Sequence, residues 1–114
     1  MKLIIAGSRR FNDYELLCWF MDRLIIKEPL EVISGCAKGA DTLGEKWAES
    51  YGIYVTRFPA DWDKYGKAAG PVRNKQMADY ADVLVAFVEK GSKGTLNMIT
   101  TAAKKPMEIH VCPF

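Results

Sequence analysis

The sequence has little of what disulfide-bonded, zinc-binding or membrane-spanning proteins require. Its three cysteines, at positions 18, 36 and 112, are an odd number without CxxC spacing, so neither a disulfide framework nor a zinc site is expected. The only histidine, His110, lies in a predicted C-terminal strand and is interpreted as a packed or edge residue. No apolar run approaches the ~20 residues that cross a bilayer. We therefore expect a reduced, cytoplasmic protein with no signal peptide and no membrane contact.

An excess of charge of one sign is also missing. The chain has 16 Lys and Arg against 14 Asp and Glu, and a net charge of +2 does not by itself imply nucleic-acid binding. Nine of the cations nevertheless fall in or beside predicted loops that follow strands: Arg9, Arg10, Lys38, Lys64, Lys67, Arg73, Lys75, Lys90 and Lys93. Two interpretations stay open, ordinary solvated loops or a rim that binds an anion.

The 114 residues fit one domain, residues 1–114, built from alternating strands and helices. Strands are predicted at 2–6, 31–34, 53–58, 83–88 and 107–111, and helices at 13–27, 42–51, 71–80 and 95–104. Strands that are apolar throughout are typical of parallel sheets covered on both faces. The pattern predicts a doubly wound, three-layer α/β sandwich of about five parallel strands and four helices, with ligands at the carboxyl edge of the sheet.

Three loops carry the functional signal. Segments 3–11 (LIIAGSRRF), 32–41 (VISGCAKGAD) and 83–95 (VLVAFVEKGSKGT) each run from a strand into a loop of small and basic residues. A strand, a glycine loop and a helix in succession turn backbone N–H groups toward an anion. The three loops together predict one nucleotide-type pocket.

The connection 59–70 is long for an α/β unit and is interpreted as a lid. Trp62 or Tyr65 can stack on a base, or these aromatic side chains can pin the loop to the protein. Arg73, in the first turn of the next helix, is the strongest single candidate for a phosphate contact, because a guanidinium offers two parallel donors. Asp61 and Asp63 are candidates for Mg²⁺ brought by a phosphate ligand, and no resident cofactor or metal is expected.

Two carboxylates one helical turn apart, Asp41 and Glu45, are candidate catalytic residues. Asp41 either caps the helix that follows it or accepts a hydrogen bond from a ribose hydroxyl. If both carboxylates point into the pocket, they can polarise a water or a sugar hydroxyl. A plain solvated helix face explains the same spacing.

Four stretches resemble the successive motifs of the family of unknown function numbered 2493: GSRRFND, VISGCAKGADTLGEKWA, FPADWDKYGKAAGPVRNKQMADYADVLVAF and GSKGTLNMI. That family is similar to the YspA-type branch of the SLOG superfamily, which is related to the LOG and DprA proteins. The resemblance spans residues 3 to about 111 and implies a Rossmann-like domain that binds nucleotides or nucleotide-derived ligands. Together with the loops, it implies contacts from Gly7, Ser8, Arg9, Gly35, Ala37, Lys38, Gly39, Ala40, Asp61, Trp62, Tyr65, Arg73, Asn74, Gly91, Ser92, Gly94 and Thr95.

The third loop is similar to the phosphate loop of LOG enzymes but departs from it at one position. LOG enzymes carry a glutamate three residues after the loop threonine, where it serves in cleaving an N-glycosidic bond. This sequence has Met98 at that place, three residues after Thr95. A catalytic carboxylate would have to come from elsewhere, from Asp41, Glu45 or Asp61.

The leading hypothesis is a module that binds a nucleotide or an NAD-derived ligand such as ADP-ribose, as a sensor or a sequestering protein. The alternative is an N-glycoside hydrolase of nucleotides, so whether the protein is an enzyme stays open. Nucleic acid, by distant analogy to DprA, is the least favoured partner because the net charge is near neutral.

The first predicted helix has more apolar residues than one buried face needs, in the runs 16–21 and 24–26. Either tight internal packing or a homo-oligomer contact covers the second face, and the latter is slightly favoured. Size-exclusion chromatography with light scattering distinguishes the two. A monomer at micromolar concentration would remove the oligomer.

Overall fold

The computed structural model describes residues 1–24 and 30–114. One parallel sheet has the strand order β3-β2-β1-β4-β5. Its strands are β1 (Lys2–Gly7), β2 (Glu31–Ser34), β3 (Tyr54–Arg57), β4 (Val83–Val88) and β5 (Glu108–Pro113). The main helices are α1 (Tyr14–Arg23), α2 (Ala40–Ser50), α4 (Ala69–Tyr80) and α5 (Lys93–Ala103). The predicted doubly wound α/β fold is confirmed.

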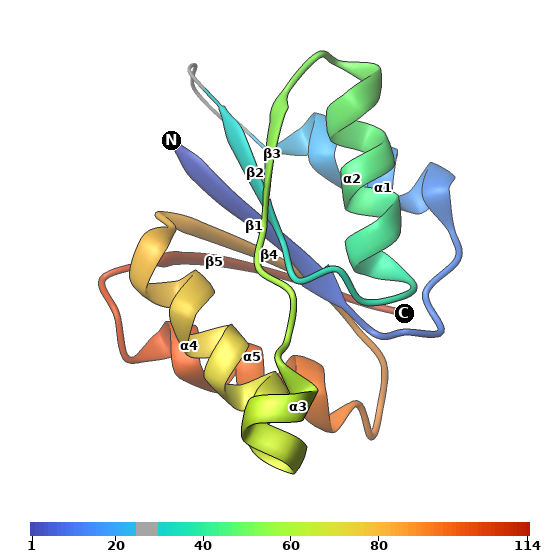
Figure 1. Cartoon of the computed structure of the whole chain (residues 1–114). Coiled ribbons are helices and arrows are strands. Elements are labelled where there is room, and N and C mark those ends of the chain that lie inside the picture. The colour runs from blue at the N-terminus through green and yellow to red at the C-terminus, as the bar shows by residue number, and fades with distance from the viewer. Residues whose placement is uncertain (25–29) are drawn as a thin grey trace.

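The helices cover both faces of the sheet, so the core has two halves. Figure 1 shows α1 and α2 on one side of the strands and α4 and α5 on the other. On the first side, Leu17 and Trp47 pack in a buried cluster with alternate strand residues such as Leu3. On the second side, Met77 and Met98 pack with strand residues of the opposite face. Burial on both faces explains why the central strands are apolar throughout.

The strand order reverses at β1, which is therefore the switch point of the sheet. From β1 the chain adds β2 and then β3 on one side, whereas β4 and β5 lie on the other. Residues 3–7 of β1 pair in parallel with residues 83–87 of β4, ending at the pair Gly7 and Phe87. The loops that leave these two carboxyl ends lead to helices on opposite faces of the sheet. In doubly wound folds such a switch point leaves a crevice in which ligands bind.

The structure corrects the predicted bounds of α1 and α2. Helix α1 ends at Arg23, with Leu24 extended, and the predicted residues 25–27 lie outside the described residues. Helix α2 begins at Ala40 with Gly39 at its N-cap, so Asp41 stands in the first turn and is not the cap. The helix starts earlier because Ala40 is already helical and buried, and its backbone N–H donates to the Ser8 carbonyl oxygen at 3.3 Å.

The long connection after β3 is not a plain loop. It contains the one-turn helix α3 (Trp62–Tyr65) and a 3₁₀ turn (Gly66–Ala68), and α4 then begins at Ala69, two residues before Pro71. Asp61 causes the first turn, because its Oδ1 accepts the Lys64 N–H at 3.1 Å and caps α3. Helix α3 lies at the lower edge of the molecule in Figure 1, beside α4.

Most of the extra apolar side chains of α1 pack inside the protein. Leu17 and Met21 are buried, and Leu16, Cys18 and Phe20 pack against the same cluster. Trp19 is 51% exposed, and the Arg23 guanidinium lies 3.7 Å from the centre of its ring. The homo-oligomer stays a prediction.

None of the described helices combines the length and the apolar composition needed to span a bilayer.

Gly7, at the end of β1, is required by packing. A Cβ at this position would lie 2.3 Å from the Phe87 carbonyl oxygen and 2.8 Å from the Ala40 Cβ. We expect Gly7→Ala to lower the free energy of unfolding by roughly 1–3 kcal/mol, because strand and helix must separate. Urea denaturation followed by circular dichroism measures the change.

Gly94→Ala is the matched control, because a Cβ at Gly94 would meet nothing within 4 Å. Alanine in the first turn of α5 should leave stability unchanged or raise it by up to about 1 kcal/mol. Equal destabilisation by both substitutions would contradict the packing explanation.

Candidate ligand-binding site

A cavity of about 840 Å³ opens at the carboxyl ends of β1 and β4. Its walls come from the loops after both strands, from the loop before α2, and from α3 and the first turns of α4 and α5. Twelve of the residues predicted to bind a ligand or to act in catalysis line it: Gly7, Ser8, Arg9, Ala37, Asp41, Trp62, Arg73, Asn74, Gly91, Ser92, Gly94 and Thr95. The tertiary structure therefore brings all three glycine-containing loops to one place.

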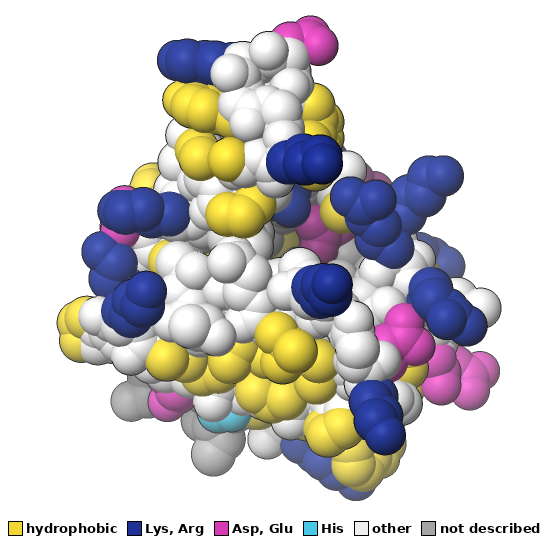
Figure 2. Space-filling view, turned by 90° about the horizontal axis from the view of Figure 1, so that it is seen from below, with side chains coloured by type: hydrophobic (Ala, Val, Ile, Leu, Met, Phe, Trp, Pro, Cys, Tyr) yellow, Lys and Arg dark blue, Asp and Glu magenta, His cyan; other side chains and the backbone are white. Residues whose placement is uncertain are grey.

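Positive charge predominates in this lining. Five cations line the cavity, Arg9, Arg10, Arg73, Lys90 and Lys93, against the two carboxylates Asp41 and Glu89. In the view from below, Lys and Arg side chains stand on both sides of a hollow in this face (Figure 2). A concave surface with more positive than negative charge attracts anions, and it does so most strongly at low ionic strength.

The loop before α2 packs tightly against the loop after β1. Gly39 has φ +78°, and a Cβ there would lie 2.3 Å from the Ser8 carbonyl oxygen. The next residue, Ala40, donates its backbone N–H to that same oxygen at 3.3 Å. Gly39 and Ala40 therefore lie behind the cavity wall and hold it together, and neither they nor Lys38 belong to the lining. Only glycine takes this backbone conformation and this close approach without strain.

Asp41 is a buried carboxyl at the cavity wall. It is 5% exposed, and its Oδ2 accepts the Ala37 N–H at 3.1 Å. Burial raises the pKa of Asp41 from 3.8 to about 6, against the opposing effects of the Ala37 N–H and the Arg73 charge. Desolvation has the largest effect on this pKa, because burial removes the water that would stabilise the ionised carboxylate. Asp41 thus titrates closer to neutral pH than an ordinary carboxyl.

Arg73 stands beside Asp41 and ties α4 to the loop after β2. Its Nη1 donates to the Gly35 carbonyl, and its Nε donates to Asn74 Oδ1 at 3.1 Å. A Cβ on Gly35 would lie 2.8 Å from both Arg73 Nη1 and Asp41 Oδ2, so Gly35 makes room for this pair. Gly35 itself lies outside the cavity lining.

Asn74 belongs to a polar chain across the helix N-termini. It is 5% exposed, and its Nδ2 donates to Asn97 Oδ1 at 2.9 Å. Asn97 also lines the cavity, and sequence reasoning did not single it out. Its position two residues after Thr95, close to the third loop, was the available signal. The chain of amides fixes α4 against α5 where both face the cavity.

The third loop contributes its backbone and one buried hydroxyl. Ser92 occupies the N-cap of α5, but its Oγ donates to Thr95 Oγ1 at 2.8 Å and caps no backbone N–H. Thr95 is 4% exposed. Met98, at the place of the LOG glutamate, is 1% exposed and packs with Ile4 in the core while touching the cavity. The loop thus joins the cavity to the N-terminus of α5, where Met98 adds an apolar side chain to the lining.

Glu89 is the second carboxylate of the lining and was missed in the sequence analysis. The Ser8 hydroxyl donates to its Oε1 at 2.6 Å. Ser8 Oγ in turn accepts the Arg10 backbone N–H at 3.1 Å. A sequence signal was present, because Glu89 is the first residue after the apolar strand 83–88, at the edge where ligands bind.

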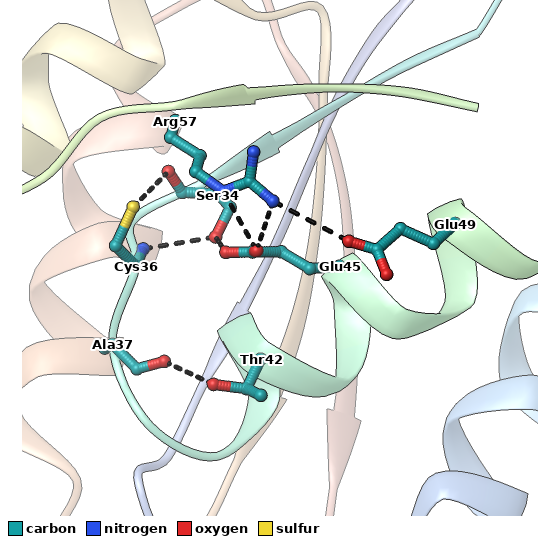
Figure 3. A network of polar contacts seen from close by, with 7 residues as sticks. All are labelled: Ser34, Cys36, Ala37, Thr42, Glu45, Glu49 and Arg57. Atoms are coloured by element: carbon teal, nitrogen blue, oxygen red, sulfur yellow. Dashed lines mark hydrogen bonds and ion pairs between the residues drawn. The ribbon is translucent and has the colours of Figure 1, made fainter. Parts of the chain in front are cut away.

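Glu45 faces away from the cavity and belongs to another network. Its Oε2 accepts a hydrogen bond of 2.6 Å from Ser34 Oγ, and its Oε1 accepts two from Arg57, at 2.8 and 3.0 Å. Figure 3 shows the Glu45 carboxylate joined by dashed lines to Ser34 and to Arg57, with Cys36 beside Ser34 on the loop that leads to Ala37. Ser34 Oγ also accepts the Cys36 N–H at 3.1 Å, which supports the unusual φ of +64° at that residue. Burial raises the pKa of the Cys36 thiol, so its reactive thiolate form is disfavoured.

The remaining predicted residues lie at the edge of the site. Trp62 lines the cavity and is 52% exposed, whereas Tyr65 and Asp61 do not line it. Asp61 caps α3, as described above. Within residues 1–24 and 30–114, no group of three or more His, Cys, Asp or Glu side chains is placed to hold a metal ion. Any Mg²⁺ at Asp61 and Asp63 stays a prediction that needs a phosphate ligand.

A parallel sheet whose strand order reverses at β1, with a cationic cavity at that point, defines a Rossmann-like domain. The chain belongs to the YspA, cpYpsA-related SLOG family, whose pattern matches residues 1–65, and this confirms the resemblance read from the motifs. It is also similar to the Gene 61 protein of Mycobacterium phage D29, with 32% identity over 111 residues that cover 90% of this chain and 89% of that protein. No solved structure shows a significant match.

The raised pKa of Asp41 predicts a pH dependence of stability. Between pH 3.8, the ordinary value, and about 6 the folded protein binds more protons than the unfolded chain, so this carboxyl lowers stability as pH rises. The difference corresponds to at most about 3 kcal/mol. We expect Asp41→Asn, which keeps an acceptor for the Ala37 N–H, to lose less stability than the wild type between pH 4 and pH 7.

Urea denaturation at several pH values measures this effect, and exposed Asp22→Asn is the control. Parallel pH profiles for the wild type and Asp41→Asn would show that the buried carboxyl does not titrate in this window.

Proposed function

We propose that this protein binds a nucleotide or a nucleotide-derived ligand, such as ADP-ribose, in the cavity at the switch point of the sheet. The observation that carries the proposal is the convergence of three glycine-containing loops and five cations at the carboxyl ends of β1 and β4. Doubly wound sheets bind ligands at this point, and helix N-termini there favour phosphate. Membership of the SLOG family agrees with a nucleotide-related function.

Each wall has a role in this proposal. Arg73 and the N–H groups at the start of α5 hold the phosphates, because a guanidinium and a helix N-terminus both favour negative charge. Lys90 and Lys93 add charge at the rim. Trp62, half exposed at the mouth, offers an aromatic face to the base. The volume of about 840 Å³ lies within the range of pockets that hold ligands of nucleotide size.

A second function is favoured by one observation, the buried Asp41 in the cavity wall with a pKa of about 6. A carboxyl that titrates near neutral pH can act as a general base or acid. In N-glycoside hydrolysis the bond between C1′ and the base nitrogen breaks, and the water oxygen bonds to C1′. The water gives up a proton, and the base leaves as its protonated form. Asp41 would accept and return that proton.

One experiment separates the two functions. The purified full chain is incubated with NAD, ADP-ribose, AMP and ADP, filtered, and heated, and both fractions are analysed by mass spectrometry. A ligand retained and recovered intact supports a sensor or sequestering module. Free base together with a sugar phosphate supports the hydrolase, and Asp41→Asn should then abolish product formation while Glu45→Gln retains it. If every compound passes through unbound and intact, the proposal fails.

Loss of Arg73 tests the phosphate contact. We expect Arg73→Ala to weaken binding of the retained ligand roughly 10- to 150-fold, because a charge-assisted contact is lost. The fold should persist, since most of the core lies elsewhere. Isothermal titration calorimetry measures the affinity, and circular dichroism reports the fold.

Lys104→Ala is the matched control for Arg73→Ala. It removes an exposed cation from the far end of α5, outside the cavity lining, and should leave the affinity nearly unchanged. Unchanged affinity in Arg73→Ala would remove this residue from the site, and equal losses in both variants would point to net charge alone.

A further inference from the structure

Glu89 is a carboxylate built into a cavity that otherwise attracts anions. It lies one residue beyond β4, and its side chain is 25% exposed. Its contacts with Ser8 at 2.6 Å and with Arg10 at 3.9 Å both involve Oε1. Because the Arg10 side chain is 85% exposed, that ion pair contributes little. Ser8 is therefore the residue that holds Glu89 in place.

The Ser8 hydroxyl has a fixed direction. Its oxygen accepts the Arg10 backbone N–H at 3.1 Å, so its single proton is directed to Glu89. Ser8 is 5% exposed and follows β1 directly. The contact thus joins the ends of β1 and β4 across the switch point, which places the carboxylate of Glu89 at a defined position in the cavity wall.

A carboxylate at this position works against the binding of phosphate alone. Arg9, Lys90 and Lys93 attract an anion to the cavity, and Glu89 repels it. An ionised carboxylate accepts hydrogen bonds and donates none. Glu89 favours binding only when the ligand presents hydrogen-bond donors to it, and a hydroxyl bound to a carboxylate forms one of the stronger hydrogen bonds in proteins.

We propose that Glu89 binds the vicinal hydroxyl groups of a ribose, so that the cavity selects ribonucleotides over deoxyribonucleotides. The inference rests on the proposed function, since the phosphates must be held in the same cavity. Oε1 stays with Ser8, and we assign Oε2 to the sugar. Glu89 is then a specificity-determining residue, and Ser8 is a positioning residue that acts through it.

The test compares three probes on the full chain by isothermal titration calorimetry: ADP, 2′-deoxy-ADP and pyrophosphate. The wild type should bind ADP roughly 10- to 150-fold more tightly than 2′-deoxy-ADP, since a hydrogen bond to a charged group is lost. In Glu89→Gln the two nucleotides should bind with similar affinity. Pyrophosphate, which has no sugar, should bind this variant at least as tightly as the wild type, because one negative charge has gone.

Two further variants complete the design. Glu15→Gln removes an exposed carboxylate of α1 outside the cavity lining and should keep the wild-type ratio of the two affinities. Ser8→Ala keeps the charge of Glu89 but removes its main contact, so it should lower the ratio less than Glu89→Gln does. It also provides a second measurement if Glu89→Gln does not fold.

Several results would overturn the inference. Equal binding of ADP and 2′-deoxy-ADP by the wild type would reject the role of Glu89 while leaving nucleotide binding intact, and so would an unchanged ratio in Glu89→Gln. If the wild type binds neither nucleotide and no pyrophosphate, the proposed function fails and the inference fails with it.

Discussion

The parallel pairing of β1 with β4 is the constraint on which the site depends. It brings the backbone of Gly7 against the carbonyl of Phe87, closer than any side chain at position 7 would permit. The loops after these strands then leave in opposite directions, and the cavity forms between them. Helix α2 approaches the same corner, where Gly39 touches the backbone of Ser8. Glycine is needed at these contacts for packing as much as for access to a ligand.

The electrostatics of the cavity follow from this geometry. Five cations from three separate segments face two carboxylates, and burial raises the pKa of Asp41 to about 6. The other carboxylate, Glu89, is held by a serine hydroxyl and not by a close cation. The cavity therefore combines an excess of positive charge with two acceptors at fixed places. A ligand with phosphates at one end and hydroxyl groups near its middle matches that distribution.

Local signals explain why the strands and the three loops could be predicted. The apolar run 83–88 is a strand because both of its faces are buried, and the predicted bounds of β2 and β4 are those of the structure. The errors fall where a particular hydrogen bond changes the course of the local backbone. Asp61 starts a turn of helix inside the predicted lid, and the contact of Ala40 with the Ser8 loop begins α2 before Asp41. The Ala40 contact depends on Ser8, which is distant in sequence, so composition and spacing do not reveal it. The Asp61 cap is local, because Lys64 follows three residues later.

The sequence by itself determined the alternation of strands and helices, the membership of the family, and the three loops that meet at one edge, because periodicity and glycine spacing are local properties. Only the tertiary structure decided which carboxylate faces the cavity. Asp41 and Glu45 lie one turn apart, yet Asp41 lines the wall while Arg57 and Ser34 hold Glu45 behind it. Glu89 likewise faces the cavity because of its hydrogen-bond partner. The direction of a side chain is set by the partners that packing brings to it, and Ser8, 81 positions away, is the partner here.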